Sequence, residues 1–252
     1  MDLLKGKVAV VTGARRGIGR AIMEKFASYG CNLMVIIREP NPAFTEYVKE
    51  LSSSFGIEIE IFYADFLDEE QVKNVAREII SQKKQIDILV NNVGLSEKIT
   101  MFSMTNIEKF KRSLEVNLIS GMVLSQYISR VMVKQKSGSI VFISSTAIYD
   151  GFANVEYCAS KSAIVGLAKR MAIELGAYNV RVNVVAPSLT STDMGNSMSE
   201  EDEKIAMSLN VMKRKARPEE IANAVAFLGS DLSSFITKQV ICVDGGLLKY
   251  TF

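Results

Sequence analysis

The chain has 252 residues, of which 48% are apolar, and this suits one α/β domain with a substantial core. The net charge is only +2 and the basic residues are spread along the chain, so charge gives no case for nucleic acid or a membrane surface. The sequence contains no histidine. Histidine triads, histidine zinc sites and imidazole bases are therefore excluded, and acid–base chemistry must come from other side chains.

We expect neither a membrane span nor a metal site. No apolar run reaches the ~18–20 residues that a spanning helix needs, and the amino-terminal segment does not resemble a signal peptide. Cys31, Cys158 and Cys242 lie far apart and form no C-x-x-C pair. This pattern disfavours a disulfide framework and indicates the reducing cytoplasm as the location.

Apolar runs of strand length alternate with helical stretches. The strand-like runs are 8–13, 33–37, 57–65, 86–94, 139–145, 180–187 and 239–246. The helical stretches are 17–29, 41–54, 67–82, 105–136, 155–177 and 218–228. Continuous apolar strands separated by helices are typical of a parallel sheet covered on both faces. The sequence predicts a Rossmann-type doubly wound α/β fold with about seven strands, as a single domain over residues 1–252.

The segment 188–217 is long, begins polar, and carries Met194, Met198, Met207 and Met212. An insertion at the carboxyl end of a parallel strand is usually a lid or substrate loop, and we expect that here. The alternative is an ordinary surface excursion with core methionines.

A glycine-rich loop follows the first strand and opens a helix. Gly13, Gly17 and Gly19 are spaced G-x-x-x-G-x-G in TGARRGIG. Such glycines permit a tight turn, let the backbone approach a pyrophosphate and let the helix pack close to the sheet. The helix N-terminus then offers free N–H groups to the phosphates, which predicts dinucleotide binding.

The end of the second strand, IIRE, bears on the choice of dinucleotide. Glu39 could be the acid that binds the ribose of NAD. Arg38 and Arg16 could instead converge on the 2′-phosphate of NADP, a group that guanidinium binds in bidentate fashion. A surface arginine beside a surface glutamate is the third interpretation.

Tyr157 and Lys161 lie four residues apart in a helical stretch, so their side chains share one face. A free tyrosine titrates near 10, and bringing it to neutrality takes roughly 3 pK units, or about 4 kcal/mol. A nearby cation favours the phenolate in this way. Ser145, at the end of a strand, could hydrogen-bond a substrate oxygen.

These motifs together resemble the main single-domain branch of the short-chain dehydrogenase/reductase family, over nearly the whole chain. TGARRGIG, Asp65, NNVG at 91–94, and Asn117 within VNLISG match family motifs in order. Ser145, Tyr157 and Lys161 match the family's catalytic set. The segment 218–246 resembles the 3-oxoacyl-ACP-reductase-like members.

The resemblance implies roles for these residues. Tyr157 is the general acid in reduction and the base in oxidation, while Lys161 lowers its pKa and binds the nicotinamide ribose. Ser145 holds the substrate oxygen, and Asn117 links Lys161 to solvent through water. The implied NADP(H) site comprises Gly13, Arg15, Arg16, Gly17, Ile18, Gly19, Arg38, Asp65, Asn91, Gly94, Tyr157, Lys161, Pro187, Thr190 and Thr192. In family register, Ile37 occupies the position of the NAD-selecting acid, which favours NADP(H).

The chain departs from the family pattern at several positions. Ser188 and Lys238 replace glycines, and a residue with a Cβ at 238 disfavours positive φ. Tyr178 stands where acyl-carrier-protein-dependent reductases often carry arginine. The serine–tyrosine spacing also leaves Ser144 as an alternative to Ser145.

We therefore expect an NADP-dependent oxidoreductase that interconverts a small-molecule carbonyl and a secondary alcohol, 3-oxoacyl-ACP-reductase-like in type. The alternatives are a sugar-nucleotide epimerase or dehydratase and a non-catalytic cofactor-binding regulator on the same fold. The family commonly forms tetramers, so the resemblance implies a homo-oligomer, either a tetramer or a dimer.

Overall fold

A computed structural model describes residues 2–82, 85–97, 99–193, 195 and 200–247. Seven parallel strands form one sheet in the order β3-β2-β1-β4-β5-β6-β7. They are β1 (Val8–Thr12), β2 (Asn32–Ile37), β3 (Ile59–Tyr63), β4 (Ile88–Asn91), β5 (Gly138–Ile143), β6 (Val180–Pro187) and β7 (Val240–Val243). The predicted doubly wound α/β fold is confirmed.

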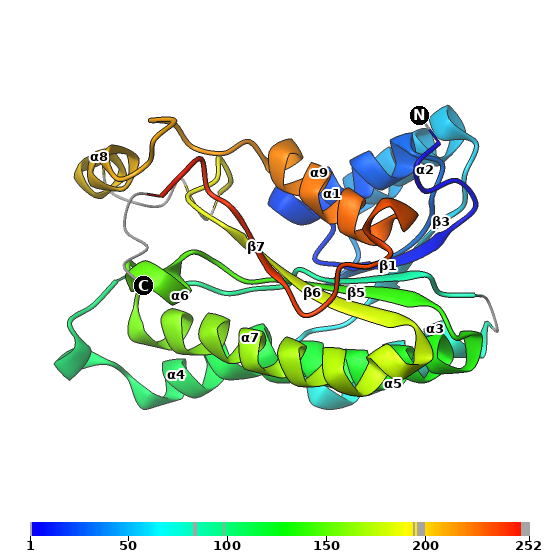
Figure 1. Cartoon of the computed structure of the whole chain (residues 1–252), viewed down its shortest axis with the longest axis horizontal. Coiled ribbons are helices and arrows are strands. Elements are labelled where there is room, and N and C mark those ends of the chain that lie inside the picture. The colour runs from blue at the N-terminus through cyan, green and yellow to red at the C-terminus, as the bar shows by residue number, and fades with distance from the viewer. Residues whose placement is uncertain (1, 83–84, 98, 194, 196–199, 248–252) are drawn as a thin grey trace.

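Helices cover both faces of the sheet (Figure 1). One face carries α1 (Gly17–Ser28), α2 (Pro42–Phe55) and α9 (Pro218–Gly229). The other carries α3 (Glu69–Ser81), α4 (Ile107–Leu114), α5 (Ser120–Gln135) and α7 (Val155–Leu175). Successive strand residues feed the two cores alternately, since Val11 packs in one core and Val10 in the other. Burial on both faces explains why the strands are continuously apolar.

The strand order reverses between β1 and β4. The chain first runs outward from β1 to β3, then crosses over to begin β4 on the other side of β1. The carboxyl ends of β1 and β4 therefore diverge, and ligands of open α/β sheets bind at such a point. Short helix α6 (Ala147–Asp150) and helix α8 (Glu200–Ser208) follow β5 and β6 at this edge.

The predicted helical stretch 105–136 consists of three successive segments. A π-helical turn, η2 (Glu115–Ile119), separates α4 from α5. By length and composition alone, Ile107–Gln135, which contains an 18-residue window with a mean hydropathy of 1.2, qualifies as a candidate membrane span, which we did not expect from the sequence. However, Leu124 and Ile128 of α5 are fully buried in the core beneath the sheet, which is the environment of a core helix.

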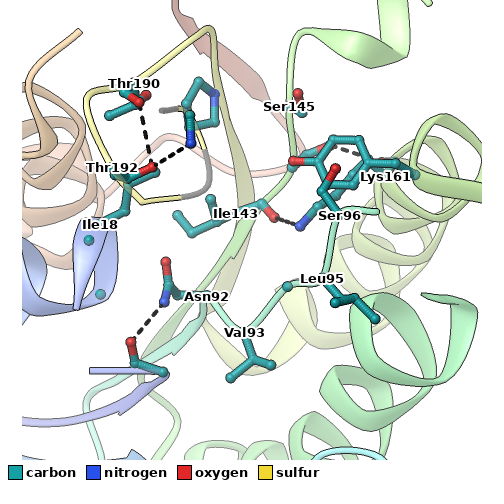
Figure 2. A pocket seen from close by; sticks show the side chains of 18 of the residues that line it. Ile18, Asn92, Val93, Leu95, Ser96, Ile143, Ser145, Lys161, Thr190 and Thr192 are labelled. Atoms are coloured by element: carbon teal, nitrogen blue, oxygen red, sulfur yellow. Dashed lines mark hydrogen bonds between the residues drawn. The ribbon is translucent and has the colours of Figure 1, made fainter. Parts of the chain in front are cut away.

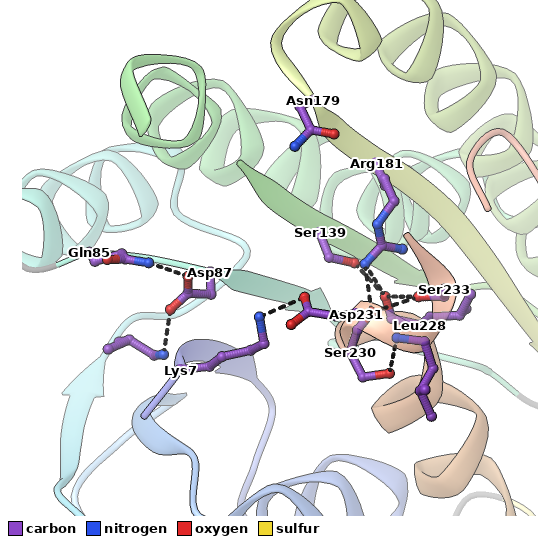
Figure 3. A network of polar contacts seen from close by, with 12 residues as sticks. Lys7, Gln85, Asp87, Ser139, Asn179, Arg181, Leu228, Ser230, Asp231 and Ser233 are labelled. Atoms are coloured by element: carbon purple, nitrogen blue, oxygen red, sulfur yellow. Dashed lines mark hydrogen bonds and ion pairs between the residues drawn. The ribbon is translucent and has the colours of Figure 1, made fainter. Parts of the chain in front are cut away.

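At the amino ends of β5 and β6, opposite the switch point, polar contacts join the strands to the end of α9 (Figure 3). The Leu228 carbonyl at the end of α9 accepts hydrogen bonds from Ser139 Oγ at 2.8 Å, Arg181 Nη2 at 2.8 Å and Ser233 Oγ at 3.0 Å. Ser233 belongs to the short helix η5 (Asp231–Ser233). These donors satisfy a carbonyl that the end of α9 leaves without a helical partner. They fix α9 against β5 and β6.

The turn before β7 keeps a left-handed residue despite the missing glycine. Lys238 has φ 64°, and its N–H donates to the Val182 carbonyl at 2.7 Å. We expected the Cβ to disfavour this conformation. The pairing of this segment with β6 holds it nonetheless, at a cost of about 1 kcal/mol.

Candidate active site

A cleft of about 550 Å³ runs along the carboxyl end of the sheet, from the glycine-rich loop to α7 and the segment 188–217 (Figure 2). With one exception, its lining includes the predicted cofactor residues from Gly13 to Thr192. Of the four predicted catalytic residues, Ser145, Tyr157 and Lys161 line it directly, and Asn117 is buried behind it.

The loop between β1 and α1 needs its glycines. Gly13 and Gly17 have φ of 69° and 56°, the left-handed region that favours glycine. A Cβ on Gly19 would collide with the Gly13 carbonyl and stand 2.5 Å from Asn92 Nδ2. These positions leave a tight backbone cradle at the N-terminus of α1, which fits the pyrophosphate of a dinucleotide.

Asn91 is the exception among the predicted cleft residues. Its side chain is buried away from the cleft and donates to Ser125 Oγ of α5 at 3.0 Å. The next residue, Asn92, lines the cleft instead, and its Nδ2 donates to the Thr12 carbonyl at 2.9 Å. Successive side chains near a strand end point to opposite faces, so the side chain of Asn92 and not that of Asn91 faces the cleft. The role of Asn91 in cofactor binding stays a prediction.

Three arginine–carboxylate contacts border the cleft, two of them at the end nearest β2 and β3 and the third between the glycine-rich loop and the segment after β6. Arg38 contacts Asp65 at 3.0 Å and Arg15 contacts Glu39 at 3.9 Å. Apolar Ile37 is buried beside them and also lines the cleft. All three contacts are partly open to solvent, the third being that of Arg16 with Asp193 at 3.1 Å.

Tyr157 and Lys161 project from the first turns of α7. The Asn154 side chain caps the helix by accepting the Tyr157 N–H at 3.0 Å, which fixes where the helix begins. Lys161 Nζ lies 5.6 Å from the centroid of the Tyr157 ring and donates to the Ile143 carbonyl at 2.9 Å (Figure 2). A Cβ on Gly94 would stand 3.1 Å from Nζ, so this glycine leaves room for the ammonium.

The two serines after β5 differ in their contacts. Ser144 is buried, and its Oγ donates to the Lys161 carbonyl at 2.9 Å. Ser145 lines the cleft, its Oγ accepts the Ala147 N–H at 3.2 Å, and its hydroxyl acts on the Tyr157 phenol by lowering the pKa of that group in part. Ser144 thus braces α7, whereas the hydroxyl of Ser145 faces the phenol.

Asn117 lies in the π-helical turn η2 and is bonded on both sides of its amide. Its Oδ1 accepts the Leu95 N–H at 2.6 Å. Its Nδ2 contacts the Leu95 carbonyl at 3.0 Å, Ser113 Oγ at 3.1 Å and Ser160 Oγ at 2.9 Å. The side chain therefore ties the segment after β4 to α4 and to the turn that carries Tyr157.

Burial dominates the acid–base properties of the pair. It raises the pKa of the Tyr157 phenol, while the hydrogen bond with Ser145 lowers that pKa in part. Burial also lowers the pKa of the Lys161 ammonium to about 8. The ammonium of Lys161 donates to the Ile143 carbonyl here, and its predicted lowering of the tyrosine pKa stays a prediction.

The segment 188–217 contributes Leu189, Thr190, Thr192, Met207 and other residues to the cleft lining. It contacts the glycine-rich loop at Thr192, whose Cγ2 would lie 3.3 Å from a Cβ on Gly17. Met212 is exposed and does not line the cleft. Met194 and Met198 lie outside the described residues, and the assignment of the segment as a lid stays a prediction.

Comparison with known proteins places this architecture in a family. Residues 13–248 match the family model described as enoyl-(acyl carrier protein) reductase. The chain is 38% identical to the 3-oxoacyl-(acyl-carrier-protein) reductase of Aquifex aeolicus over 245 residues, covering 97% of this chain and 98% of that protein. This chain belongs to the short-chain dehydrogenase/reductase family. The resemblance predicted from the motifs is confirmed, and the chain is an enzyme of this oxidoreductase family.

Other short-chain dehydrogenase/reductases match along almost their whole length. The 3α-hydroxysteroid dehydrogenase of Mediterraneibacter gnavus is 37% identical, with 96% of this chain and 97% of that protein covered. A 7α-hydroxysteroid dehydrogenase complexed with NADH and a 7-oxo bile acid is 32% identical, with a TM-score of 0.89 and coverage of 99% and 98%. A candidate NAD(P)-dependent gluconate 5-dehydrogenase from Beutenbergia cavernae, with bound NADP, is 34% identical, with a TM-score of 0.91 and coverage of 98% for both chains.

Sequence reasoning missed two residues of the short-chain dehydrogenase/reductase site. Asn92 lines the cleft, and the hydroxyl of Ser160 links Asn117 to the Tyr157 carbonyl, to which it donates at 2.9 Å. The sequence places Ser160 directly before Lys161 in the predicted helix. However, nothing in the sequence indicated that the Asn117 side chain would contact Ser160.

Proposed function

We propose that this short-chain dehydrogenase/reductase uses NADP(H) to interconvert a carbonyl and a secondary alcohol, with Tyr157 as the general acid and base. The observation that carries the proposal is the convergence of the Tyr157 phenol with the Ser145 hydroxyl in a cleft that begins at the glycine cradle. A proton donor and a second hydrogen-bonding group on one carbonyl oxygen are what reduction requires.

Each of the four site residues has its own role in the proposed reaction. The nicotinamide, when bound, supplies or accepts the hydride. Tyr157 gives its proton to the carbonyl oxygen during reduction, and Ser145 orients that oxygen by hydrogen bonding. The charge of Lys161 favours the phenolate that remains and binds the ribose hydroxyls. Asn117 has its side chain committed to protein groups, so we assign its share of the proton path to its main chain.

The choice of NADP(H) is supported by the charges at the end of β2. Apolar Ile37 offers no carboxylate for a ribose 2′-hydroxyl, and Arg38 follows it directly. The Arg16–Asp193 contact is exposed and the Arg38–Asp65 contact is partly open to solvent, and ion pairs that water reaches contribute little. Both guanidinium groups can therefore exchange a carboxylate for a phosphate.

We expect Arg38→Gln to weaken NADPH binding by about 10- to 100-fold, the value of a charged hydrogen bond, and to leave NADH binding nearly unchanged. Fluorescence titration with both cofactors measures this. Lys49→Gln, which alters an exposed ion pair with Glu46 outside the cleft, serves as the control. A wild-type enzyme that prefers NADH would contradict the assignment of NADP(H).

The contacts of the two serines give a matched test. Ser145→Ala should lower kcat by about 100-fold with NADPH affinity retained, because a donor to the reacting oxygen is lost. Ser144→Ala should mainly cost stability, by about 1 kcal/mol, through the lost bond to the Lys161 carbonyl. Steady-state kinetics and denaturant melts of both variants decide it, and the reverse ranking of kcat would reassign the role to Ser144.

The direct test of the proposal is an NADPH-consumption screen over acyl, steroid and sugar carbonyls, with NADH in parallel. The relatives' names span all three classes and so select none of them. Product formation without net NADPH change would favour an epimerase or dehydratase instead. NADPH binding without any turnover would favour a cofactor-binding regulator.

The setting proposed for the enzyme is the cytoplasm, where it acts as a homo-oligomer. All three cysteines are free thiols, as a reducing compartment permits. The homo-oligomer, a tetramer or dimer, is inferred from the habit of the family.

A further inference from the structure

The cleft beyond Tyr157 and Ser145 is walled by apolar side chains from separate parts of the chain. They are Leu95, Phe152, Leu189, Met207, Leu209 and Leu247. An antiparallel bridge between Asn210 and Leu247 holds the segment after β7 against the segment 188–217. The wall is thus assembled by contacts within the described chain.

The polar side chains on the same wall are already bonded to protein groups. Asn210 is buried, with Nδ2 donating to the Asp244 carbonyl at 2.7 Å and Oδ1 accepting the Met212 N–H at 2.7 Å. Arg214 forms a bidentate pair with Glu220 at 2.7 and 2.8 Å. These hydrogen bonds hold the pocket together and occupy the polar groups that could otherwise bind a ligand.

Ser188 also lines the cleft, and its Oγ is buried without a hydrogen-bond partner among the described residues. The other polar groups on this wall are few. Asp150 Oδ1 accepts the Phe152 N–H at 2.7 Å. Ser96 lines the cleft near Lys161 (Figure 2) and offers a single hydroxyl. Arg112 also lines the cleft but is exposed, so a charged group beside it stays hydrated. This inventory, taken over the described residues, is small for a ligand with a hydroxyl on every carbon.

We infer that the substrate carries its carbonyl on an apolar chain or ring body, rather than on a polyhydroxylated sugar acid. A polyol in this pocket would lose hydrogen bonds to water without replacement, which is costly. An apolar body would instead gain from each buried methylene, and that gain corresponds to about 3- to 4-fold in binding. The inference rests on the proposed function, since it names the substrate class of that reaction.

The kinetic test compares methyl 3-oxoalkanoates of increasing chain length with an oxo-gluconate, using the full chain and NADPH. We expect kcat/KM to rise by about 3- to 4-fold per added methylene until the pocket is filled. The oxo-gluconate should fall about 100-fold or more below the best ester, because hydroxyl groups buried in the apolar pocket lose their hydrogen bonds to water without replacement. A flat series, or an oxo-gluconate that equals the esters, would overturn the inference.

A binding test separates this inference from the proposed reaction. Methyl 3-hydroxyalkanoates of the same chain lengths are titrated calorimetrically into the NADP-loaded protein. Affinity that tightens with chain length, even without turnover of any carbonyl, supports the apolar pocket while the proposed function fails. Affinity independent of chain length overturns the pocket inference, whatever the turnover.

A matched pair of variants locates the effect. Met207→Gln keeps the side-chain length but places an amide in the wall, and should lower the gain per methylene to below about 2-fold with NADPH affinity unchanged. Met104→Gln makes the same change at an exposed residue of the short helix η1 (Phe102–Met104), which does not line the cleft, and should keep the wild-type gain. Equal slopes in the two variants would remove Met207 from the wall.

Discussion

Tyr157→Phe is expected to lower kcat for carbonyl reduction by about 1,000-fold, the middle of the range for general acid catalysis. The phenol is the only protic group on Tyr157, and the change leaves the ring that packs against the cleft in place. NADPH affinity should stay within about 2-fold, because the ring of a buried aromatic residue supplies most of its contact area. Stopped-flow reduction and fluorescence titration measure the two effects separately.

Tyr178→Phe provides the matched control. This tyrosine is 45% exposed in the short helix η3 (Gly176–Tyr178) beyond the end of α7, and it does not line the cleft. The control should have wild-type kcat. A Tyr157→Phe enzyme that reduces carbonyls at the wild-type rate would remove Tyr157 from the role of general acid.

Lys161→Met should abolish most activity and yet stabilise the fold. Burial lowers the pKa of Lys161 from 10.5 to about 8, so a charged lysine at neutral pH costs folding free energy. The shift corresponds to roughly 3 kcal/mol, and about 1 kcal/mol of this is offset by losing the bond to Ile143. We expect a net gain of about 2 kcal/mol at neutral pH.

The lowered pKa of Lys161 also makes the stability difference between the two proteins depend on pH. Between pH about 8 and 10.5 the unfolded chain keeps the Lys161 proton while the folded chain has released it. The wild type therefore gains stability relative to Lys161→Met as pH rises through this window, and the gap between them closes. Denaturant melts of both proteins at neutral and alkaline pH measure the gap.

Lys169→Met, an exposed lysine on the same helix, is the control and should change stability little at any pH. A Lys161→Met protein that is less stable than the wild type, by an amount independent of pH, would show that burial of the ammonium does not cost folding free energy.

The sequence was sufficient where local periodicity determines geometry. Tyr157 and Lys161 share a face because helical spacing requires it, and Gly13, Gly17 and Gly19 adopt the cradle that their spacing predicts. The fold followed from continuous apolar strands, which only a sheet buried on both faces explains. These are short-range consequences of residue type.

The sequence was insufficient where the position of a side chain depends on a shift of one residue or on a long-range contact. Asn91 and Asn92 are adjacent asparagines of the NNVG motif, but only the side chain of Asn92 lies in the cleft. The serine–tyrosine spacing left Ser144 as an alternative to the predicted Ser145, and their different contacts with α7 distinguish the two. The left-handed Lys238 shows that pairing with β6 overrides a local preference against positive φ.

The central claim is that hydride passes between NADP(H) and a carbonyl carbon in this cleft. The most direct measurement is the fate of deuterium from NADPH that carries deuterium at both C4 positions of the nicotinamide, followed by mass spectrometry of the product from a methyl 3-oxoalkanoate. We expect deuterium on the carbinol carbon of the product alcohol, in step with NADPH oxidation. A product without deuterium, or a carbonyl returned unchanged while the label stays on the cofactor, would contradict the claim.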